Sequence, residues 1–116
     1  MKILVCGDRF WTGIDSIKKE LDQYPRNAII IHGACKGADS LGGYVANRLG
    51  FKNIQEYPAD WKQFGKAAGP IRNREMLKQN PDLVLAFHKH IEDSKGTKDM
   101  LVIAEKAGIE TKLISE

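Results

Sequence analysis

Three short stretches of the sequence place glycine and a cation together after an apolar run. They are residues 7–9 (Gly-Asp-Arg), 33–39 (Gly-Ala-Cys-Lys-Gly-Ala-Asp) and 94–97 (Ser-Lys-Gly-Thr). Glycine lets a phosphate approach the backbone closely, and a helix that begins there offers unpaired N–H groups and a positive dipole end. Taken singly, each stretch is also compatible with an ordinary turn. Taken together, they predict a site for a phosphate-bearing ligand.

A cation from a fourth segment is a further candidate for this site. Arg72 and Asn73 fall in the first turn of a helix that we expect to begin at Gly69-Pro70, because proline is favoured at the first helical position. A guanidinium there acts with the helix dipole and can form two parallel hydrogen bonds to phosphate or carboxylate. Considered alone, Arg72 is better interpreted as a solvated surface arginine.

Aromatic and acidic side chains near these stretches suggest contacts to the rest of a nucleotide. Trp11 and Trp61 could stack on a base, or could simply cover the edge of a sheet. Asp8 and Asp39 could bind ribose hydroxyls, or could cap the starts of helices. His32, at the end of an apolar run, is more typical of a structural histidine than of a catalytic base.

The sequence gives little support to metal, cofactor or nucleophilic chemistry. The segment from His88 to Asp93 contains two histidines and two acidic residues. These polar side chains are better interpreted as part of a solvent-exposed loop than as metal ligands. There is no GxGxxG after the first apolar run, no GxxxxGK[ST] and no GxSxG. We therefore expect no metal, no classical dinucleotide or P-loop cofactor and no serine nucleophile.

Composition predicts one small domain, residues 1–116, located in the cytoplasm. The longest apolar run, Leu83 to Phe87, is far shorter than the roughly 18 residues of a membrane span, and the N-terminus does not read as a signal peptide. Two cysteines, Cys6 and Cys35, form no disulfide framework. A net charge of +3 permits an anionic partner. It is too small an excess of positive charge to favour nucleic acid as that partner.

Apolar runs and amphipathic segments alternate along the chain. The expected strands are residues 2–6, 27–32, 53–57, 82–87 and 111–114, and the expected helices are residues 14–24, 41–49, 70–80 and 100–107. Runs that are apolar on both faces are typical of a parallel sheet covered on both sides. The pattern predicts a three-layer, Rossmann-like doubly wound α/β fold with five parallel strands. Right-handed crossovers favour the strand order 3-2-1-4-5.

This fold predicts where the candidate residues meet. In open parallel sheets, ligands bind beyond the carboxyl ends of the strands, at the point where the strand order reverses. The glycine-bearing stretches all follow strands that end at this edge. The connection over residues 58–68 is about twice the usual length, carries Trp61 and Phe64, and is predicted to be a functional loop.

Four motifs together resemble a known protein family. They are Gly7-Asp8-Arg9-x-Trp11, His32-Gly33-x3-Gly37-Ala38-Asp39, Trp61-x3-Gly65-x2-Ala68-Gly69-x2-Arg72-Asn73-x2-Met76, and Gly96-Thr97. This set is similar to the YspA-type branch of the SLOG superfamily, a Rossmann-like group that includes the DNA-processing protein DprA and the cytokinin-activating phosphoribohydrolases. The similarity runs through nearly the whole chain, and the third motif is its most specific part.

The resemblance implies a protein that binds nucleotides or nucleotide-derived molecules, ADP-ribose-like ligands among them, and that forms a dimer or larger homo-oligomer. Carried onto this chain, it implies a site made of Gly7, Asp8, Arg9, Trp11, His32, Gly33, Gly37, Asp39, Arg72, Asn73, Gly96 and Thr97. The residues themselves add Lys36, Trp61 and Ser94 to these candidates. We expect the site to use no cofactor.

The resemblance also raises the possibility of hydrolysis. Residues 72–76 look like the Arg-Lys-x-x-Met segment of the phosphoribohydrolases, whose arginine is catalytic, which makes Arg72 a catalytic candidate. Those enzymes carry a Pro-Gly-Gly-x-Gly-Thr loop followed by a catalytic glutamate. Here residues 92–97 lack the double glycine, and Asp99 stands at the glutamate position. Binding as a sensor, sponge or accessory protein is therefore preferred to hydrolysis of nucleoside monophosphates, and single-stranded DNA binding ranks last.

Overall fold

The computed structural model describes residues 1–115 and contains one five-stranded parallel sheet, as the sequence predicts. The strands run in the order β3-β2-β1-β4-β5. Their bounds are β1 Lys2–Gly7, β2 Ile29–His32, β3 Asn53–Glu56, β4 Leu83–Phe87 and β5 Glu110–Ile114. The order reverses between β1 and β4, so the ends of these two strands mark the switch point at which ligands bind in folds of this kind.

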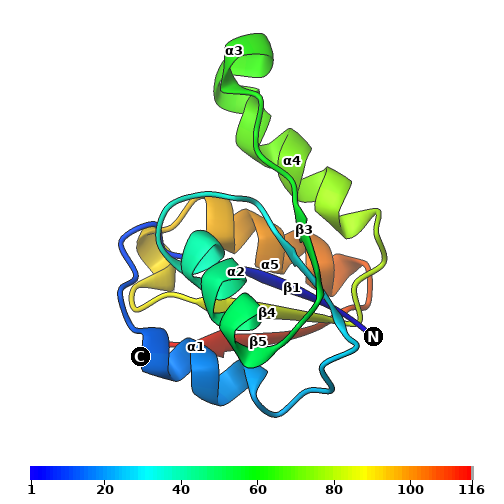
Figure 1. Ribbon diagram of the computed structural model, residues 1–116. Coiled ribbons are helices and arrows are strands. Elements are labelled where there is room, and N and C mark those ends of the chain that lie inside the picture. The colour runs from blue at the N-terminus through cyan, green and yellow to red at the C-terminus, as the bar shows by residue number, and fades with distance from the viewer. Residues whose placement is uncertain (116) are drawn as a thin grey trace.

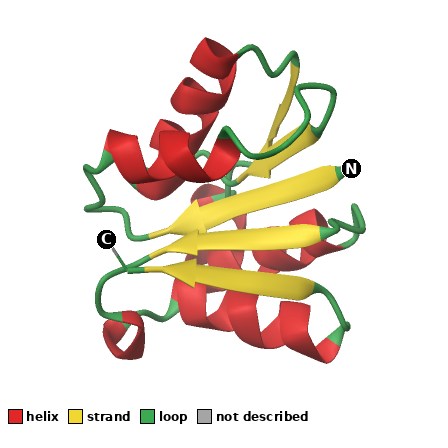
Figure 2. Ribbon diagram, turned by 90° about the horizontal axis from the view of Figure 1, so that it is seen from below, coloured by secondary structure: helices red, strands yellow, loops and turns green. Residues whose placement is uncertain are grey.

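Helices cover both faces of the sheet, which gives the three layers expected (Figure 2). Helices α1 (Ile14–Leu21) and α2 (Ala38–Leu49) pack on one face, and α4 (Ala68–Leu77) and α5 (Gly96–Lys106) pack on the other. Alternate residues of β1 divide between the two cores: Ile3 and Val5 face α1 and α2, whereas Leu4 and Cys6 face α4 and α5. Burial on both sides explains why the central strands β1, β2 and β4 read as continuous apolar runs, whereas the edge strands β3 and β5 are more polar and more exposed.

Two adjacent glycines let α2 lie close to the sheet. A Cβ atom at Gly42 would come within 2.7 Å of Val5 Cγ1, and one at Gly43 within 2.6 Å of His32 Nε2. Both distances are shorter than van der Waals contact, so a larger residue at either position would push the helix outward. The start of α2 is consequently held next to the ends of β1 and β2.

The connection after β3 differs from the long loop that was predicted. Residues 61–67 form a short helix, α3 (Trp61–Phe64), and a 3₁₀ turn, η1 (Gly65–Ala67), that lead directly into α4. The Asp60 carboxylate starts α3 by accepting a hydrogen bond from the Gln63 N–H at 3.1 Å. Helix α4 begins at Ala68 rather than at Pro70. Proline is tolerated there because the first N–H groups of a helix have no intrahelical partner.

These residues project from the body of the molecule (Figure 1). We call residues 58–70 the arm, with α3 at its tip and the first turn of α4 at its base. Every residue from 61 to 67 is exposed. Within residues 1–115, no helix is both long enough and apolar enough to cross a membrane.

Candidate functional site

The first two glycine-bearing turns are in direct contact at the carboxyl edge of the sheet. The Asp8 carbonyl oxygen accepts a hydrogen bond from the Ala38 N–H at 3.0 Å. Gly37 has a φ of +76°, and a Cβ atom there would overlap the backbone of Asp8 and Arg9. Glycine is required at this position because the turn after β1 occupies the space that a side chain would need.

The third turn is joined to the second through α4. Arg72 Nη1 donates to the Gly33 carbonyl oxygen at 2.7 Å, and Arg72 Nε donates to Asn73 Oδ1 at 3.2 Å. The buried Asn73 amide in turn donates to the Gly96 carbonyl oxygen at 3.2 Å. A line of hydrogen bonds therefore crosses the edge of the sheet from the end of β2 to the start of α5, and the three turns lie together.

Arg72 reaches this position from the second turn of α4, not from the first turn as predicted. Because α4 begins at Ala68, Arg72 is its fifth residue, so the dipole of this helix adds little to its attraction for an anion. Arg72 Nη1 also lies 3.4 Å from Cys35 Sγ. The guanidinium is therefore oriented by three groups of the protein itself.

Asp39 places a carboxylate at the start of α2, among the three turns. It is 5% exposed, and its Oδ2 accepts the Gly33 N–H at 2.9 Å. Burial raises the pKa of Asp39 to about 6, against the lowering effects of the Gly33 backbone, Arg72 and the Gly7 backbone. Burial, followed by the charge of Asp39, also raises the pKa of the neighbouring Cys6 thiol.

This carboxylate occupies the place where a phosphate was expected at the start of α2. The Ala38 N–H donates to Asp8, as described above, and the Ser40 N–H donates to the Cys35 carbonyl oxygen at 3.0 Å. A Cβ atom at Gly33 would overlap the Arg72 guanidinium and would lie 2.9 Å from Asp39 Oδ2. The N–H groups of Ala38 and Ser40 are thus bound to backbone carbonyl oxygens of the protein, and the space beside Gly33 is filled by its own Arg72 and Asp39 side chains.

The start of α5 is the open part of the edge. Gly96 has no atom within 4 Å of the place where a Cβ would be. The N–H groups of Gly96 and Lys98 have no hydrogen-bond partner among residues 1–115. The Ser94 hydroxyl accepts the Thr97 N–H at 3.0 Å and can still donate its own proton. These groups, with the exposed Lys95, can meet an anion.

Asp99, the other catalytic candidate, is engaged with α4. Its Oδ2 accepts hydrogen bonds from Asn73 Nδ2 at 3.1 Å and from Arg74 Nη1 at 3.3 Å. These contacts attach the first turn of α5 to α4. They also hold the carboxylate in a structural position between the two helices.

Of the two alternatives that the sequence left open for the tryptophans, Trp11 takes the structural one. Trp11 is 5% exposed: its indole N–H donates to the Gly13 carbonyl oxygen at 2.9 Å, and its ring packs edge-on against Phe87. Trp61 lies on α3 at the tip of the arm. Phe10, which the sequence analysis did not select, is 76% exposed on the same turn as Asp8. The Arg9 guanidinium carbon lies 5.1 Å from the centre of its ring.

Of the remaining candidates, His32 and Gly7 are packed inside the protein near the carboxyl edge of the sheet, and Lys36 is exposed there. His32 is buried under α2, accepts the Ala34 N–H at Nδ1, and has its pKa lowered by burial. A Cβ atom at Gly7 would overlap the Phe87 carbonyl oxygen. Lys36 is exposed on the second turn. Within residues 1–115, His, Cys, Asp and Glu side chains form no group of three that could hold a metal ion.

A cavity of about 170 Å³ adjoins this edge at the end of β3. It lies between the arm and the body, and its lining includes Tyr57, Phe64, Ile71 and Arg72. Arg72 therefore contributes both to the line of hydrogen bonds and to the wall of this cavity.

Comparison with known proteins identifies the family. The family model YAcAr, described as "YspA, cpYpsA-related SLOG family", matches residues 1–64. The chain is also 35% identical over 116 aligned residues to the Gene 61 protein of Mycobacterium phage D29, with 93% of this chain and 91% of that protein covered. The protein belongs to this SLOG family. Membership confirms the predicted YspA-type resemblance and is consistent with nucleotide-related binding. No solved structure matches the chain.

The family match covers the first two turns, including Gly37, and suggests a test of their contact. Replacing Gly37 by alanine is expected to destabilise the SLOG fold by about 2–4 kcal/mol, because it adds backbone overlap to the roughly 1–3 kcal/mol cost of a side chain at a φ of 76° and a ψ of −132°. Gly108→Ala is the control, since Gly108 has a φ of +75° and no atom within 4 Å. Chemical denaturation measures both; equal losses would contradict close contact between the turns.

The buried Asp39 carboxylate predicts a pH-dependent stability. Its pKa is about 6 in the folded protein against an ordinary value of 3.8, so its unfavourable contribution is absent below the ordinary value, develops as the pH rises between these two values, and is constant above about 6. Asp39→Asn removes this titration. The melting temperature of the variant minus that of the wild type should therefore increase from pH 4 to pH 8. A difference that stays constant over this range would show that Asp39 is not desolvated.

Proposed function

We propose that this SLOG protein binds a phosphate-bearing, nucleotide-derived ligand, such as an ADP-ribose-like molecule or a signalling nucleotide, at the carboxyl edge of its sheet. The observation that carries the proposal is the open first turn of α5, where unpaired N–H groups lie next to the Ser94 hydroxyl. The position at the switch point of the strand order and the family membership support the same conclusion.

In this proposal the phosphate binds the N–H groups of Gly96 and Lys98, with the hydroxyl of Ser94 as a third donor. The exposed ammonium groups of Lys95 and Lys98 add positive charge around this turn. Charge-assisted hydrogen bonds of this kind are about twice as strong as neutral ones. The start of α2 stays with Asp39 and does not receive phosphate.

The remainder of the ligand extends toward the turn after β1. Phe10 supplies an exposed aromatic face on which a base can stack, a contact worth about 1–3 kcal/mol per base. The half-buried Asp8, whose Oδ1 already accepts the Phe10 N–H at 2.9 Å, is placed to accept a ribose hydroxyl. Asp39 is too deeply buried for that role, and Trp11 too deeply buried to stack.

Binding is a better proposal than turnover for this site. Hydrolysis of an N-glycosidic bond requires a carboxylate that is free to stabilise an oxocarbenium-like transition state. The Asp99 carboxylate is held by Asn73 and Arg74, and the Asp39 carboxylate is buried at the start of α2. Nothing in the described part of the chain favours single-stranded DNA, and the net charge of +3 gives it little attraction.

Calorimetric titration with ADP-ribose, its cyclic forms, NAD and cyclic dinucleotides tests the proposal. At least one of them is expected to bind the wild-type protein. Gly96→Asp should weaken that binding at least tenfold, because it places a negative charge at the phosphate position while favouring the start of a helix. The fold should therefore remain intact, with an unchanged or higher melting temperature.

Asn47→Asp provides the matched control for this charge change. It adds the same charge at an exposed position near the opposite end of α2, and its affinity should equal that of the wild type. Absence of heat with every ligand, or equal weakening by both variants, would rule out a phosphate site at the start of α5.

A further inference from the structure

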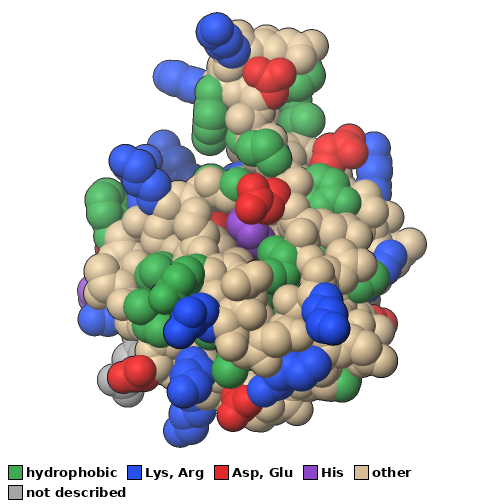
Figure 3. Space-filling view, viewed as in Figure 1, with side chains coloured by type: hydrophobic (Ala, Val, Ile, Leu, Met, Phe, Trp, Pro, Cys, Tyr) green, Lys and Arg blue, Asp and Glu red, His purple; other side chains and the backbone are tan. Residues whose placement is uncertain are grey.

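The cavity between the arm and the body has walls from three segments of the chain. They are the end of β3, the arm, and one side of α4 on which Ala68, Arg72 and Glu75 follow one another at helical spacing. Figure 3 shows the arm standing clear of the body, with apolar, acidic and basic side chains on it. Sites for drug-sized ligands measure about 300–1,000 Å³, so a cavity of about 170 Å³ suits one planar ring system rather than a whole nucleotide.

Two contacts within the chain hold the arm in place. The Trp61 ring packs on the base of the arm, where a Cβ atom at Gly69 would lie 3.3 Å from Trp61 Cη2. The Asp60 carboxylate caps α3. These contacts restrain the short helix that carries Phe64, whose side chain lines the cavity together with that of Tyr57. Aromatic rings at the wall of such a cavity offer a stacking surface for a base.

The charged groups that line the cavity leave both donors and acceptors free. Within residues 1–115, Arg72 uses Nη1 and Nε for hydrogen bonds to the protein and has no partner for Nη2. Asp60 caps α3 with Oδ1 and has no partner for Oδ2 in the same part of the chain. The Glu75 carboxylate is in an exposed ion pair, Oε1 to Lys78 Nζ at 3.5 Å, a contact of little strength. One guanidinium and two carboxylates disfavour a phosphate here and favour a neutral group that both accepts and donates hydrogen bonds.

Guanine is the base whose edges match these groups. Its N7 and O6 are neighbouring acceptors, the pair that arginine contacts most often when proteins recognise bases. Its N1–H and N2–H₂ are neighbouring donors, from which a carboxylate can accept two hydrogen bonds. Adenine, cytosine and uracil each lack at least one of these two pairs. A cavity that offers a free guanidinium N–H pair and free carboxylate oxygens is therefore complementary to guanine.

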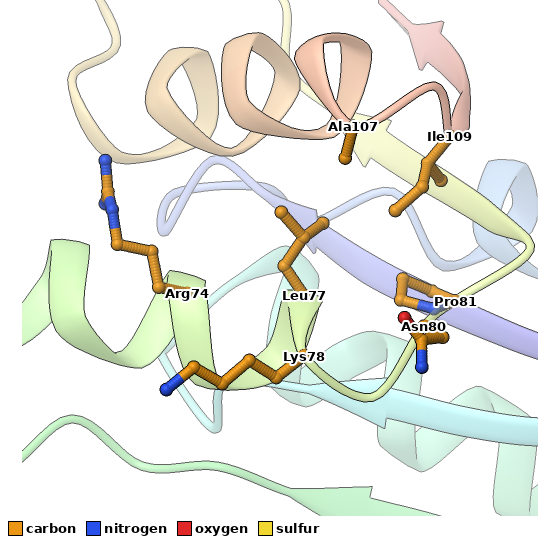
Figure 4. Close-up of a pocket in the computed structure, with 7 residues that line it drawn as sticks. All are labelled: Arg74, Leu77, Lys78, Asn80, Pro81, Ala107 and Ile109. Carbon is orange, nitrogen blue, oxygen red and sulfur yellow. The ribbon is translucent and has the colours of Figure 1, made fainter.

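The larger hollow on α4 does not have this chemistry. It is a groove of about 500 Å³ between α4 and the end of α5, lined by apolar side chains with Arg74 and Lys78 (Figure 4). No carboxylate among residues 1–115 lines it. Pro81 and Ile109 come just before β4 and β5, which places the groove toward the amino edge of the sheet. Ligands of this kind of fold bind at the carboxyl edge, where the smaller cavity shares Arg72 with the site described above.

We propose that the cavity between the arm and the body is a base subsite that selects guanine. Phe64 and Tyr57 stack on the ring, and Arg72 Nη2 donates to its acceptor edge. The carboxylates of Asp60 and Glu75 accept hydrogen bonds from its donor edge. The ligand of this protein is accordingly a guanine nucleotide.

The inference rests on the proposed function in one respect, which is that the phosphate of the same ligand lies at the start of α5. Arg72 at the cavity wall is joined to that turn by Asn73, which accepts from Arg72 Nε and donates to the Gly96 carbonyl oxygen. Phe10 follows β1, whereas the cavity adjoins the end of β3, two strands away. A ligand that fills both positions therefore carries two bases, with guanine in the cavity.

Binding of guanosine, inosine and adenosine to the full chain, measured by ligand-detected NMR, tests the choice of base without using a phosphate. Guanosine is expected to bind more tightly than either of the others by roughly tenfold or more. Inosine keeps N7, O6 and N1–H and lacks only the N2 amine, so it isolates the contact to the carboxylates. Adenosine presents neither the acceptor pair nor the donor pair.

The double variant Asp60→Asn/Glu75→Gln should weaken guanosine binding by roughly tenfold and abolish the preference over inosine. Asparagine still caps a helix and Glu75 is exposed, so the variant should fold. The matched control is Asp15→Asn/Glu105→Gln, which removes the same two charges at exposed positions on α1 and α5. Its affinity for guanosine should equal that of the wild type.

The phosphate site is tested separately with 5′-GMP. It should bind the wild type more tightly than guanosine does, and Gly96→Asp should remove this gain while leaving guanosine binding unchanged. Loss of the gain together with equal binding of the three nucleosides would overturn the guanine subsite and leave the phosphate site standing. Guanosine selectivity with no effect of Gly96→Asp on 5′-GMP would do the reverse.

Three results would overturn the guanine subsite. The first is that guanosine does not bind, or binds no more tightly than inosine and adenosine. The second is that Asp60→Asn/Glu75→Gln leaves guanosine binding unchanged. The third is that the control variant weakens guanosine binding as much as the cavity variant does.

Discussion

The carboxyl edge of this protein is organised around one buried carboxylate. Asp39 is removed from water at the head of α2, where it accepts the Gly33 N–H and faces Arg72. Burying a charge is costly unless hydrogen bonds and an opposite charge compensate it. The compensation fixes the neighbouring groups: Arg72 binds the Gly33 carbonyl oxygen, and Asn73 then connects Arg72 to the start of α5. The arrangement of the three turns depends on this set of contacts.

This organisation gives the glycines two different roles. At Gly7, Gly33 and Gly37 a side chain would overlap other groups of the protein, so these residues are needed for close packing of the chain on itself. At Gly96 the space is open and the N–H is unpaired within residues 1–115. Only the latter situation leaves donors for an external anion. A SLOG protein of this size thus separates a self-filled turn, which holds the edge together, from an open turn, which can receive a ligand.

Helix α4 links this edge to the rest of the surface. Its second turn supplies Arg72 and Asn73, its base carries the arm, and its last turn borders the groove between α4 and α5. Asp99 attaches it to α5 through Asn73 and Arg74. A partner that contacts α4 along its outer face would consequently restrain the helix that orients the site arginine, without touching the open turn itself.

The amino-acid sequence was sufficient to determine the fold class, the strand order and the family, because these depend on local properties. Apolar runs and helical periodicity identify the elements, and right-handed crossovers then favour the order 3-2-1-4-5, which the structure has. The motifs at the strand ends follow from the same pattern, since parallel strands all end at one edge. The hydrogen-bonding capacity of Asp8, Arg72 or Ser94 is likewise a property of the residue type.

Tertiary structure alone decided which of these groups are exposed to solvent and which are turned into the protein. Trp11 and Phe10 are neighbours in one turn, and only the direction of that turn sends Trp11 into the core and Phe10 into water. Asp39 and Arg72 are 33 positions apart in the sequence, so their proximity depends on how α4 packs against β2. This packing also determines that the two side chains occupy the space at the start of α2. The projection of the arm has the same origin. Such outcomes are set by contacts between segments distant in the chain, which no local pattern encodes.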